Sequence, residues 1–545
     1  MIIRIIPALF LCLVATEGMS QTQKMPVIQT TSFKKDTFNI TKFGAKADAL
    51  TLNTTAINNA IIACNKNGGG VVQVPPGFWL TGPVILLSNV NLYLQKNALL
   101  QFTSDLSQYK LIETNWEGLP AVRNESPLSA TNAINIGITG SGIIDGNGDV
   151  WRMVKRDKLT DGEWKRKVAS GGNLSEDKKT WYPSASSLRG STVTKAGVIE
   201  NGKGIADYID IKDFLRPNLL VFTKCDKVLL EGVTFQNSPA WCLHPLMSSN
   251  ITVRNISVKN PWYAQNGDGI DIESCRNVLV ENSTFDVGDD GICIKSGRDA
   301  EGRKRAMPTQ DVIIRNCTVY HAHGGFVIGS EMSGGAKNIF VDNCTFIGTD
   351  IGLRFKTTRG RGGVVENIFI KDIVMTSIVG EAILFDMYYA AKDPIALPGE
   401  KREAPKVEFQ AVTEATPQFK NIYIKDVVCD GADKAIFIRG LPEMNIRDIN
   451  LDNITIISRK GIDMSEAQRI NMKNVNLVVS DKNPGIDVLN SSNLSFSNVS
   501  VKQDAPVVLR IGGDRSLNIN WTNSLDTKDK RVFEFGAKEN ALIVK

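Results

Sequence analysis

A short strand-like phrase recurs through much of the chain, and this repeat constrains the fold more than any other feature. Its first three copies are KVLLEGVTF from Lys227, NITVRNISV from Asn250 and NVLVENSTF from Asn277. Ten copies begin at intervals of 23, 27, 34, 27, 29, 54, 24, 24 and 24 residues. Each copy alternates apolar and polar residues and is rich in β-branched residues, the pattern of a β-strand. A repeat of short strands at this period, with no helical pattern, indicates a solenoid.

We predict an all-β fold, a right-handed parallel β-helix with an N-terminal cap and inserted loops. Each coil supplies short strands, and inward Ile, Val and Phe stack into a continuous core. Asn or Asp recurs at one position of the phrase, where we expect a turn. Leucine-rich repeats have a similar period but need a fixed Leu and Asn spacing that is missing here. A β-sandwich is the remaining alternative, although it would not keep so regular a phrase.

The segments flanking and interrupting the repeats define the domain organisation. Residues 1–20 combine an early Arg, an apolar run too short to span a bilayer and small residues before Gln21, which is typical of a signal peptide. Residues 21–105 are predicted to form the N-terminal cap and first strands, with a helix in TTAINNAIIACNKNGGG. Residues 106–525 form the predicted β-helix domain, and residues 526–545 a C-terminal tail or cap. We therefore expect an exported protein, periplasmic or secreted, that does not act at a membrane.

Residues 149–216 break the rhythm and are predicted to be an inserted loop region inside the β-helix. This segment is rich in charged residues and Ser, and its three Trp residues (Trp151, Trp164 and Trp181) favour packing over disorder.

Charge and cysteine usage exclude several classes of function. The net charge is +5, and no phosphate loop or nucleotide fingerprint occurs, so we expect neither a nucleic-acid partner nor a nucleotide cofactor. Eight Cys follow residue 20, and none forms a CxxC pair, so zinc is not expected. Buried free thiols are the expected state, with one or two disulfides as the alternative. Calcium is not expected either, because its sites need several converging oxygen ligands. We therefore expect no metal site.

Three Asp residues lie about one coil apart among glycines. Asp268 precedes Asp289 by 21 residues and Asp290 by 22. Residues one coil apart stack about 4.8 Å apart, so the three carboxylates should gather on one patch of the outer surface. Crowded carboxylates raise one another's pKa, and one of them can then hold a proton while another stays ionised. The sequence therefore predicts an acid–base site.

The following coils add an imidazole and two cations. His323 follows Asp290 by 33 residues, and Arg354 and Lys356 follow His323 by 31 and 33 residues. Because residues two apart in a strand face the same side, Arg354 and Lys356 should project together. Acids beside paired cations suit an anionic substrate.

Other polar residues of these coils have simpler interpretations. Asp271 and Glu273 alternate with Ile, which predicts a solvated strand face. His244 and His321 are interpreted as structural. Lys295 and Arg298 are weaker candidates for contact with substrate.

The blocks NGDGID, GDDGICIKSG, HGGFVIGSE and LRFKT, in this order, resemble the signature blocks of the polygalacturonases, glycoside hydrolase family 28. The similarity covers most of residues 38–390. The resemblance implies a β-helix that hydrolyses α-1,4-galacturonosyl bonds of pectic polysaccharide by single displacement with inversion, without a cofactor. It also implies a role for individual residues: Asp289 as the general acid, with Asp268 and Asp290 activating the water.

The resemblance further assigns residues around these carboxylates. His323 corresponds to the His that tunes the acid, and Arg354 and Lys356 to the residues that grip the substrate carboxylate. Tyr389 corresponds to a later substrate-contacting Tyr, with Tyr388 as its rival. Asn266 completes the first block, and Lys295 is included among the substrate-binding candidates.

Two features qualify the resemblance. Gly267 stands where the family commonly has Thr, a variant that resembles bacterial members attacking chain ends, and the 149–216 insertion resembles the loops that close their groove. We therefore expect exo-action. A carboxylate spacing of about 5 Å, taken alone, would indicate a retaining enzyme, whereas the resemblance implies inversion.

Three alternative functions remain open from the sequence. A rhamnogalacturonan or other pectic-backbone hydrolase would use the same fold and acids. A pectate lyase-like enzyme would act by β-elimination, and a non-catalytic β-helix would only bind carbohydrate.

Overall fold

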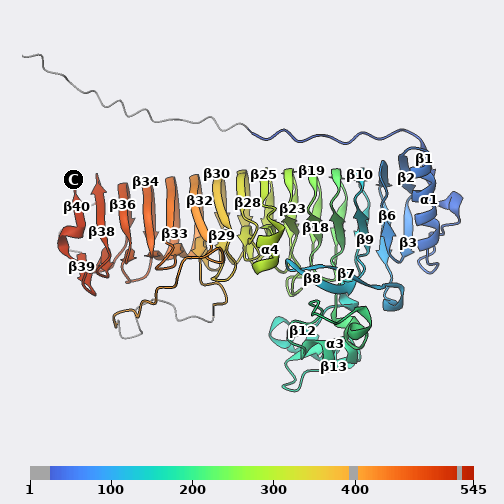
Figure 1. The fold of residues 1–545 in the computed structure, drawn as a ribbon, viewed down its shortest axis with the longest axis horizontal. Coiled ribbons are helices and arrows are strands. Elements are labelled where there is room, and N and C mark those ends of the chain that lie inside the picture. Colours follow the sequence, from blue (N-terminus) through green and yellow to red (C-terminus); the bar gives the residue numbers. More distant parts are fainter. Residues whose placement is uncertain (1–24, 392–402, 524–530) are drawn as a thin grey trace, which may run out of the picture.

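The computed structural model describes residues 25–391, 403–523 and 531–545, and it shows a rod of stacked coils (Figure 1). Every strand of the main sheet pairs in parallel with a strand of the coil before or after it. The chain therefore advances along the rod by one strand spacing per coil. This architecture confirms the predicted right-handed parallel β-helix. The predicted signal peptide, residues 1–20, lies outside the described residues.

The strands stack in three columns along the rod, and a typical coil visits each column once. Column 1 contains β1 (Thr37–Asn39), β2 (Gly70–Val74), β5 (Val90–Leu94), β10 (Ile134–Gly140), β16 (Asp226–Glu231), β19 (Ser249–Arg254), β22 (Arg276–Glu281), β25 (Thr309–Arg315), β38 (Leu517–Thr522) and β40 (Leu542–Val544). Column 2 contains β3 (Gly77–Thr81), β6 (Ala98–Phe102), β11 (Ile143–Asp145), β17 (Thr234–Gln236), β20 (Ser257–Lys259), β23 (Thr284–Asp286) and β26 (Thr318–Tyr320).

Column 3 carries the predicted site, and it is built of short strands. They are β4 (Val84–Ile85), β9 (Leu128–Thr131), β15 (Leu220–Thr223), β18 (Leu243–Leu246), β21 (Ile270–Glu273), β24 (Asp290–Lys295), β27 (Gly324–Gly329), β29 (Leu353–Lys356), β31 (Glu381–Asp386), β35 (Ile486–Leu489), β37 (Leu509–Gly512) and β39 (Arg531–Glu534). Longer strands pass from column 1 into the next columns: β28 (Ala336–Ile347), β30 (Val364–Thr376), β32 (Gln418–Arg439), β33 (Ile446–Ser465), β34 (Ala467–Val479) and β36 (Ser492–Lys502).

Stacked aliphatic side chains fill the interior of the rod. In column 1, Val278 pairs in register with Ile251 on one side and Val312 on the other, and all three are buried. Asn side chains form matching ladders at the turns: Asn316 donates to Asn282 at 3.0 Å and accepts from Asn343 at 2.9 Å. These three residues have positive φ angles, which confirms that the recurring Asn marks a turn.

A helix covers the N-terminal end of the rod, as predicted. Helix α1 (Thr54–Lys66) buries Ile57, Ala60, Ile61 and Cys64. It contacts β1, β2, β4 and β5, and the short 3-10 helix η1 (Ile40–Phe43). The apolar face of the helix therefore continues the core past the last coil. At the other end, β39 and β40 pair with β37 and β38, so residues 531–545 belong to the main sheet, and η6 (Glu539–Ala541) joins them.

The 149–216 segment forms a small lobe beside the rod (Figure 1). It contains η3 (Gly148–Val150), η4 (Arg156–Lys158), α2 (Asp161–Ala169), α3 (Ala185–Ser191), η5 (Ile205–Phe214) and a three-stranded antiparallel sheet of β12 (Val154–Lys155), β14 (Thr180–Tyr182) and β13 (Asn173–Leu174). Trp164 and Trp181 pack together in one cluster, and Trp151 packs edge-on to Tyr109 at 5.2 Å. The predicted packing of the three Trp residues is thus confirmed.

A hairpin of β7 (Leu111–Trp116) and β8 (Leu119–Asn124) lies where the lobe meets the rod, preceded by η2 (Leu106–Gln108) (Figure 1). Helix α4 (Asp299–Arg305) lies on the rod near this hairpin. The eight described Cys are free and buried, as expected. Among the described helices, none is long and apolar enough to cross a membrane.

Asn316 provides a test of the turn ladder. Asn316→Gly removes both ladder hydrogen bonds, but glycine tolerates the φ of +54° at this position. We therefore expect a loss of about 1 kcal/mol in the free energy of unfolding. Asn316→Ala should lose about 1 kcal/mol more, because a Cβ strains the left-handed conformation. Urea denaturation of both variants measures the difference. Equal midpoints for Gly and Ala would show that the turn conformation is not what Asn provides.

Candidate active site

The three predicted carboxylates meet at the start of column 3. Asp268 lies two residues before β21, and Asp290 opens β24, which pairs with β21 in parallel register. One side-chain oxygen of each of Asp268, Asp289 and Asp290 lies within 4.8 Å of the others. The predicted gathering of the three acids is therefore confirmed.

The acid patch is less open than the sequence predicts. Asp268 and Asp290 are 3% and 1% exposed, whereas the side chain of Asp289 is 22% exposed. Lys356 and Arg354, which come from a later coil, lie against Asp290, and strand alternation alone does not reveal this. Asp289 is thus the acid of the three that a ligand can reach most directly.

Close backbone packing shapes the turn before Asp268. A Cβ at Gly267 would lie 2.8 Å from both the Cβ and the carbonyl oxygen of Ala264. A side chain at this position would therefore require Ala264 or the local backbone to shift. Asn266 adopts φ +51° just before it and accepts a hydrogen bond from Arg216 at 2.9 Å.

Two cations from β29 bind the buried Asp290. Lys356 Nζ lies 2.7 Å from its Oδ2, and Arg354 Nη1 lies 3.5 Å from its Oδ1. Burial opposes ionisation of Asp290, but the charges of Lys356, Arg354 and Lys295 outweigh it and hold the pKa of that carboxyl below its ordinary range. Asp290 is therefore ionised in the folded protein.

Asp268 has the opposite environment. Its Oδ1 is buried and has no hydrogen-bond partner within the described chain. Burial, followed by the charges of Asp271 and Asp289, raises the pKa of Asp268 well above its ordinary value. The site thus holds an ionised carboxylate, Asp290, next to Asp268, which favours its protonated form, as expected where acids are crowded together.

His323 is hydrogen-bonded to Asp289. Its Nδ1 lies 3.1 Å from Oδ1 of Asp289, and the backbone N–H of Asp290 donates to the same oxygen at 3.0 Å. The bond to Asp289 raises the pKa of His323 against the opposing effect of burial. Asp350 lies 3.8 Å from Nε2 on the other side of the ring.

Tyr389 lies beside the cation pair, and Tyr388 does not. Lys356 Nζ and the guanidinium of Arg354 lie 5.0 and 5.7 Å from the centre of the Tyr389 ring. Tyr388 is buried, and its ring instead packs against the guanidinium groups of Arg359 and Arg439.

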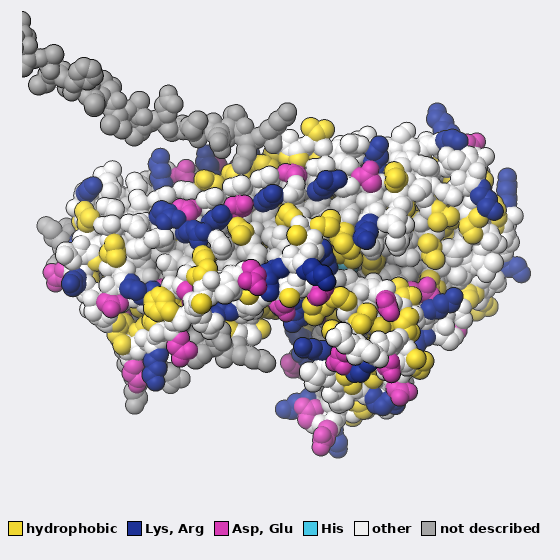
Figure 2. Space-filling view, in the orientation of Figure 1, with side chains coloured by type: hydrophobic (Ala, Val, Ile, Leu, Met, Phe, Trp, Pro, Cys, Tyr) yellow, Lys and Arg dark blue, Asp and Glu magenta, His cyan; other side chains and the backbone are white. Residues whose placement is uncertain are grey.

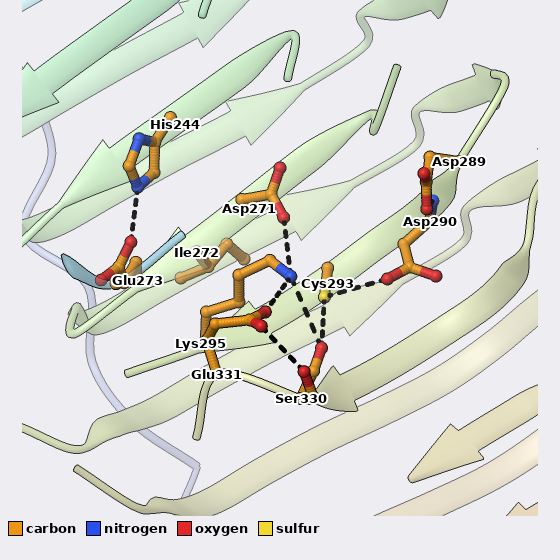
Figure 3. Close-up of polar contacts among 12 residues, drawn as sticks. His244, Asp271, Ile272, Glu273, Asp289, Asp290, Cys293, Lys295, Ser330 and Glu331 are labelled. Carbon is orange, nitrogen blue, oxygen red and sulfur yellow. Dashed lines mark hydrogen bonds and ion pairs between the residues drawn. The ribbon is translucent and has the colours of Figure 1, made fainter. Parts of the chain in front are cut away.

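Lys295 is directed into the protein. It is 4% exposed, and its Nζ lies 3.1 Å from Glu331 and 3.6 Å from Asp271, as Figure 3 shows. It also lies 4.9 Å from the centre of the Trp241 ring. Its charge is thereby balanced by interior carboxylates that sequence reasoning did not connect with it.

The expectation that Asp271 and Glu273 form a solvated strand face is wrong, since both are fully buried. Glu273 binds His244 at 2.8 Å and Arg305 at 2.6 Å, and Asp271 faces Lys295 (Figure 3). Arg305 belongs to α4, whose segment covers this face of column 3. Alternation identifies the outward face of a strand but not what covers it.

The acid cluster is the one group of His, Cys, Asp or Glu in the described ranges whose geometry could hold a metal ion. Lys356 and Arg354 already neutralise Asp290, and their charge opposes a further cation there. The arrangement instead suits proton transfer to and from an anionic substrate. Such paired carboxyl chemistry is that of a glycosidase.

Comparison with known proteins identifies the same class of enzyme. Residues 197–430 match glycosyl hydrolases family 28. The crystal structure of a hyperthermoactive exopolygalacturonase from Thermotoga maritima is similar, with a TM-score of 0.65, 30% identity, and coverage of 83% of this chain and 93% of that chain. The chain is 29% identical over 391 residues to an exo-poly-alpha-D-galacturonosidase of Dickeya chrysanthemi, covering 69% of this chain and 61% of the relative. It is also 28% identical to an endo-polygalacturonase of Pectobacterium carotovorum subsp. carotovorum. That match covers 68% of this chain and 79% of the relative.

The fold and the comparisons together define a glycosidase. The chain belongs to glycosyl hydrolases family 28.

The burial of Asp268 predicts a pH-dependent change in stability. A raised pKa means that the folded state loses stability as pH rises from about 4, where an unfolded Asp ionises, toward the folded pKa. Asp268→Asn removes this cost, so the variant should unfold at a higher temperature than the wild type at pH 7, with the gap closing toward pH 4. Thermal unfolding at several pH values measures it. The exposed Asp210→Asn serves as control, and a lower melting temperature of Asp268→Asn at pH 7 would contradict the expectation.

Proposed function

We propose that this glycosidase hydrolyses α-1,4-galacturonosyl linkages of polygalacturonate, with inversion and from the chain ends. The observation that carries the proposal is the acid cluster together with its two cations. Lys356 and Arg354 come from a strand two coils further along the rod, and both contact Asp290. The names of the similar exo-enzymes from Thermotoga maritima and Dickeya chrysanthemi support the substrate and the mode of action.

Asp289 is the proposed general acid. It is the most exposed of the three carboxyls, so it can approach the glycosidic oxygen and transfer a proton to the leaving sugar. Its Oδ1 is held by the backbone of Asp290 and by His323, which leaves Oδ2 to carry the proton. His323 orients this carboxyl and balances its charge once the proton has left.

Asp268 and Asp290 are the proposed pair that holds the attacking water. The ionised Asp290 accepts a proton from the water while the water oxygen attacks the anomeric carbon. Asp268 orients the same water. In this arrangement two carboxyls hold the water and the third acts as the acid. Single displacement is then possible although the three carboxyls lie close together. The spacing rule for inversion and retention applies to sites with two carboxyls.

Arg354, Lys356 and Tyr389 are the proposed contacts to the substrate. The arginine can form paired hydrogen bonds with a uronate carboxylate, and the lysine supplies a point charge beside the ring of Tyr389. In the structure both cations bind Asp290, and a carboxylate so strongly stabilised is a weak base. A bound uronate would compete for the same cations and thereby raise the basicity of Asp290. Asn266, the other proposed contact, is held in place by a hydrogen bond from Arg216 to its Oδ1.

We also propose that the chain is exported, because residues 1–20 have the pattern of a signal peptide. A mature protein from the periplasm or medium that begins near Gln21 is the expected finding. Recovery of the uncleaved chain in the cytoplasm would contradict it.

Asp289→Asn tests the catalytic assignment. The variant should release reducing sugar from polygalacturonate at least about 100-fold more slowly, because a positioned general acid contributes about that factor or more. Its melting temperature should be nearly unchanged, since this side chain is partly exposed. Asp372→Asn, at an exposed turn, should keep full activity. Full activity of Asp289→Asn would remove the assignment, and a product with an unsaturated ring would indicate elimination instead.

The mode of attack is tested by viscosity measured together with reducing ends. Attack at chain ends should release product of one size from the first minutes, while the viscosity of polygalacturonate falls slowly. Cleavage inside the chain would lower viscosity steeply at low conversion and yield oligomers of mixed length. The second pattern would contradict the exo assignment while leaving the hydrolytic assignment intact.

A further inference from the structure

Asp289, His323 and Asp350 occupy equivalent positions on three successive coils of the rod. They lie just before β24, β27 and β29, the neighbouring strands of column 3. The parallel register of these strands stacks Asp289 on His323 and His323 on Asp350. Successive members are therefore about one strand spacing apart along the axis. We call this row of acid, imidazole and acid the charge ladder.

The charge ladder ends at a glycine on both sides. The register of β21 with β24 places Gly267 next to Asp289, and the register of β29 with β31 places Gly380 next to Asp350. Neither glycine carries a side chain. The ladder is therefore limited to three groups, and His323 is the member that lies between the other two.

Backbone hydrogen bonds hold the charge ladder together. The N–H of His323 donates to the carbonyl of Asp289 at 2.9 Å, and the N–H of Asp350 donates to the carbonyl of Ala322 at 2.7 Å. The guanidinium of Arg354 donates to the carbonyl of His323 at 3.1 Å. The three side chains therefore keep their order as long as the coils stay paired.

Each ring nitrogen of His323 faces a carboxylate. Nδ1 lies 3.1 Å from Asp289, within hydrogen-bond distance, and Nε2 lies 3.8 Å from Asp350, which is a charge contact at longer range. A neutral imidazole has one N–H, so it must turn a lone pair toward one of the two carboxylates. An imidazolium presents an N–H to both. The charge ladder therefore favours the doubly protonated ring.

Other charges within the site act on the same ring. The hydrogen bond to Asp289 contributes most to the raised pKa of His323, and the charges of Asp289, Asp290 and Asp350 act in the same direction against burial. Arg354 is the cation in contact with His323, and its guanidinium also lies 3.5 Å from Asp290. Among the described residues, no Lys or Arg forms an ion pair with Asp350. The charge of Asp350 is thus directed at His323 alone.

A cavity of about 680 Å³ lies between the charge ladder and η4 of the lobe. His323 and Asp350 line it, and its other charged groups are Lys158 of η4 and the pair formed by His321 and Asp286 at 3.2 Å. On the face shown in Figure 2, side chains of both signs lie where the lobe meets the rod. No single sign of charge dominates there, so the nearest carboxylate decides the field at Nε2.

We propose that Asp350 is a positioning residue for the reaction, which acts through His323 by keeping that ring in its imidazolium form. The proposal rests on the proposed function, in which Asp289 is the general acid. A protonated Nδ1 occupies Oδ1 of Asp289 and leaves the transferable proton on Oδ2. When that proton passes to the glycosidic oxygen, the new carboxylate lies beside a cation. Without the charge of Asp350, the ring loses its proton at lower pH and this support is lost earlier.

Titration of the histidine rings by NMR tests the charge ladder without any reaction. The chain has three His, so protein labelled at histidine gives few signals, and His321→Gln helps to assign them. In Asp350→Asn, His323 should titrate about half a pH unit lower than in the wild type at low salt. The difference should shrink in about 1 M salt, because Asp350 is 52% exposed. Asp350→Glu keeps the charge and should restore most of the difference.

Asp286→Asn is the matched control. Asp286 lies on the wall of the same cavity, is 51% exposed and contacts His321 rather than His323. Its replacement removes the same charge from a neighbouring position, so the titration of His323 should stay as in the wild type. An equal effect of Asp286→Asn and Asp350→Asn would overturn the proposal, because the ladder position would then have no special influence.

The pH profile of kcat/KM connects the charge ladder with the reaction. In Asp350→Asn the alkaline limb should move to lower pH by about the same half pH unit, with kcat at the optimum changed less than about threefold. An identical His323 titration in this variant and the wild type would overturn the proposal. So would an equal loss of activity at every pH with a lower melting temperature, which would show a purely structural role. Absence of any hydrolysis by the wild type would refute the proposed function, and the NMR titration would still decide whether Asp350 holds the charge of His323.

Discussion

The axial stacking of parallel strands is the constraint on which the rest of the structure depends. One coil is added for each strand spacing, so residues separated by the length of a coil become neighbours whatever lies between them. The same register that stacks Val278 between Ile251 and Val312 in the core brings Asp268 beside Asp290 in the acid cluster. Insertions of any length leave the rod between coils, which is why the lobe and the hairpin can be added without disturbing the site.

Burial and charge then divide the roles among chemically identical groups. Asp268 and Asp290 are both nearly inaccessible, yet their pKa values shift in opposite directions, because Lys356 and Arg354 reach only Asp290. Asp289, adjacent in sequence, remains partly open and is bound to His323. The crowding of three acids is tolerated because cations from the same column balance one of them.

The fold and the acid cluster could be predicted because both follow from spacing along one chain. The repeat predicted the β-helix, the 21- and 22-residue separations predicted the cluster, and the Trp residues of the lobe predicted its packing. The environment of each group could not be predicted in the same way. Asp271 and Glu273 are buried by Lys295 and Arg305, which arrive from other segments.

Recognition of the acidic sugar and the basicity of Asp290 depend on the same two cations. Lys356 and Arg354 hold Asp290 in a form too stable to be a strong base, and a uronate that competes for them would restore its basicity, so that recognition of the acidic sugar also prepares the chemistry. An anionic substrate can compete with Asp290 for these two cations, and a neutral sugar cannot. Under the proposed function, selectivity for uronates would then arise from the same two cations that hold the pKa of Asp290 low.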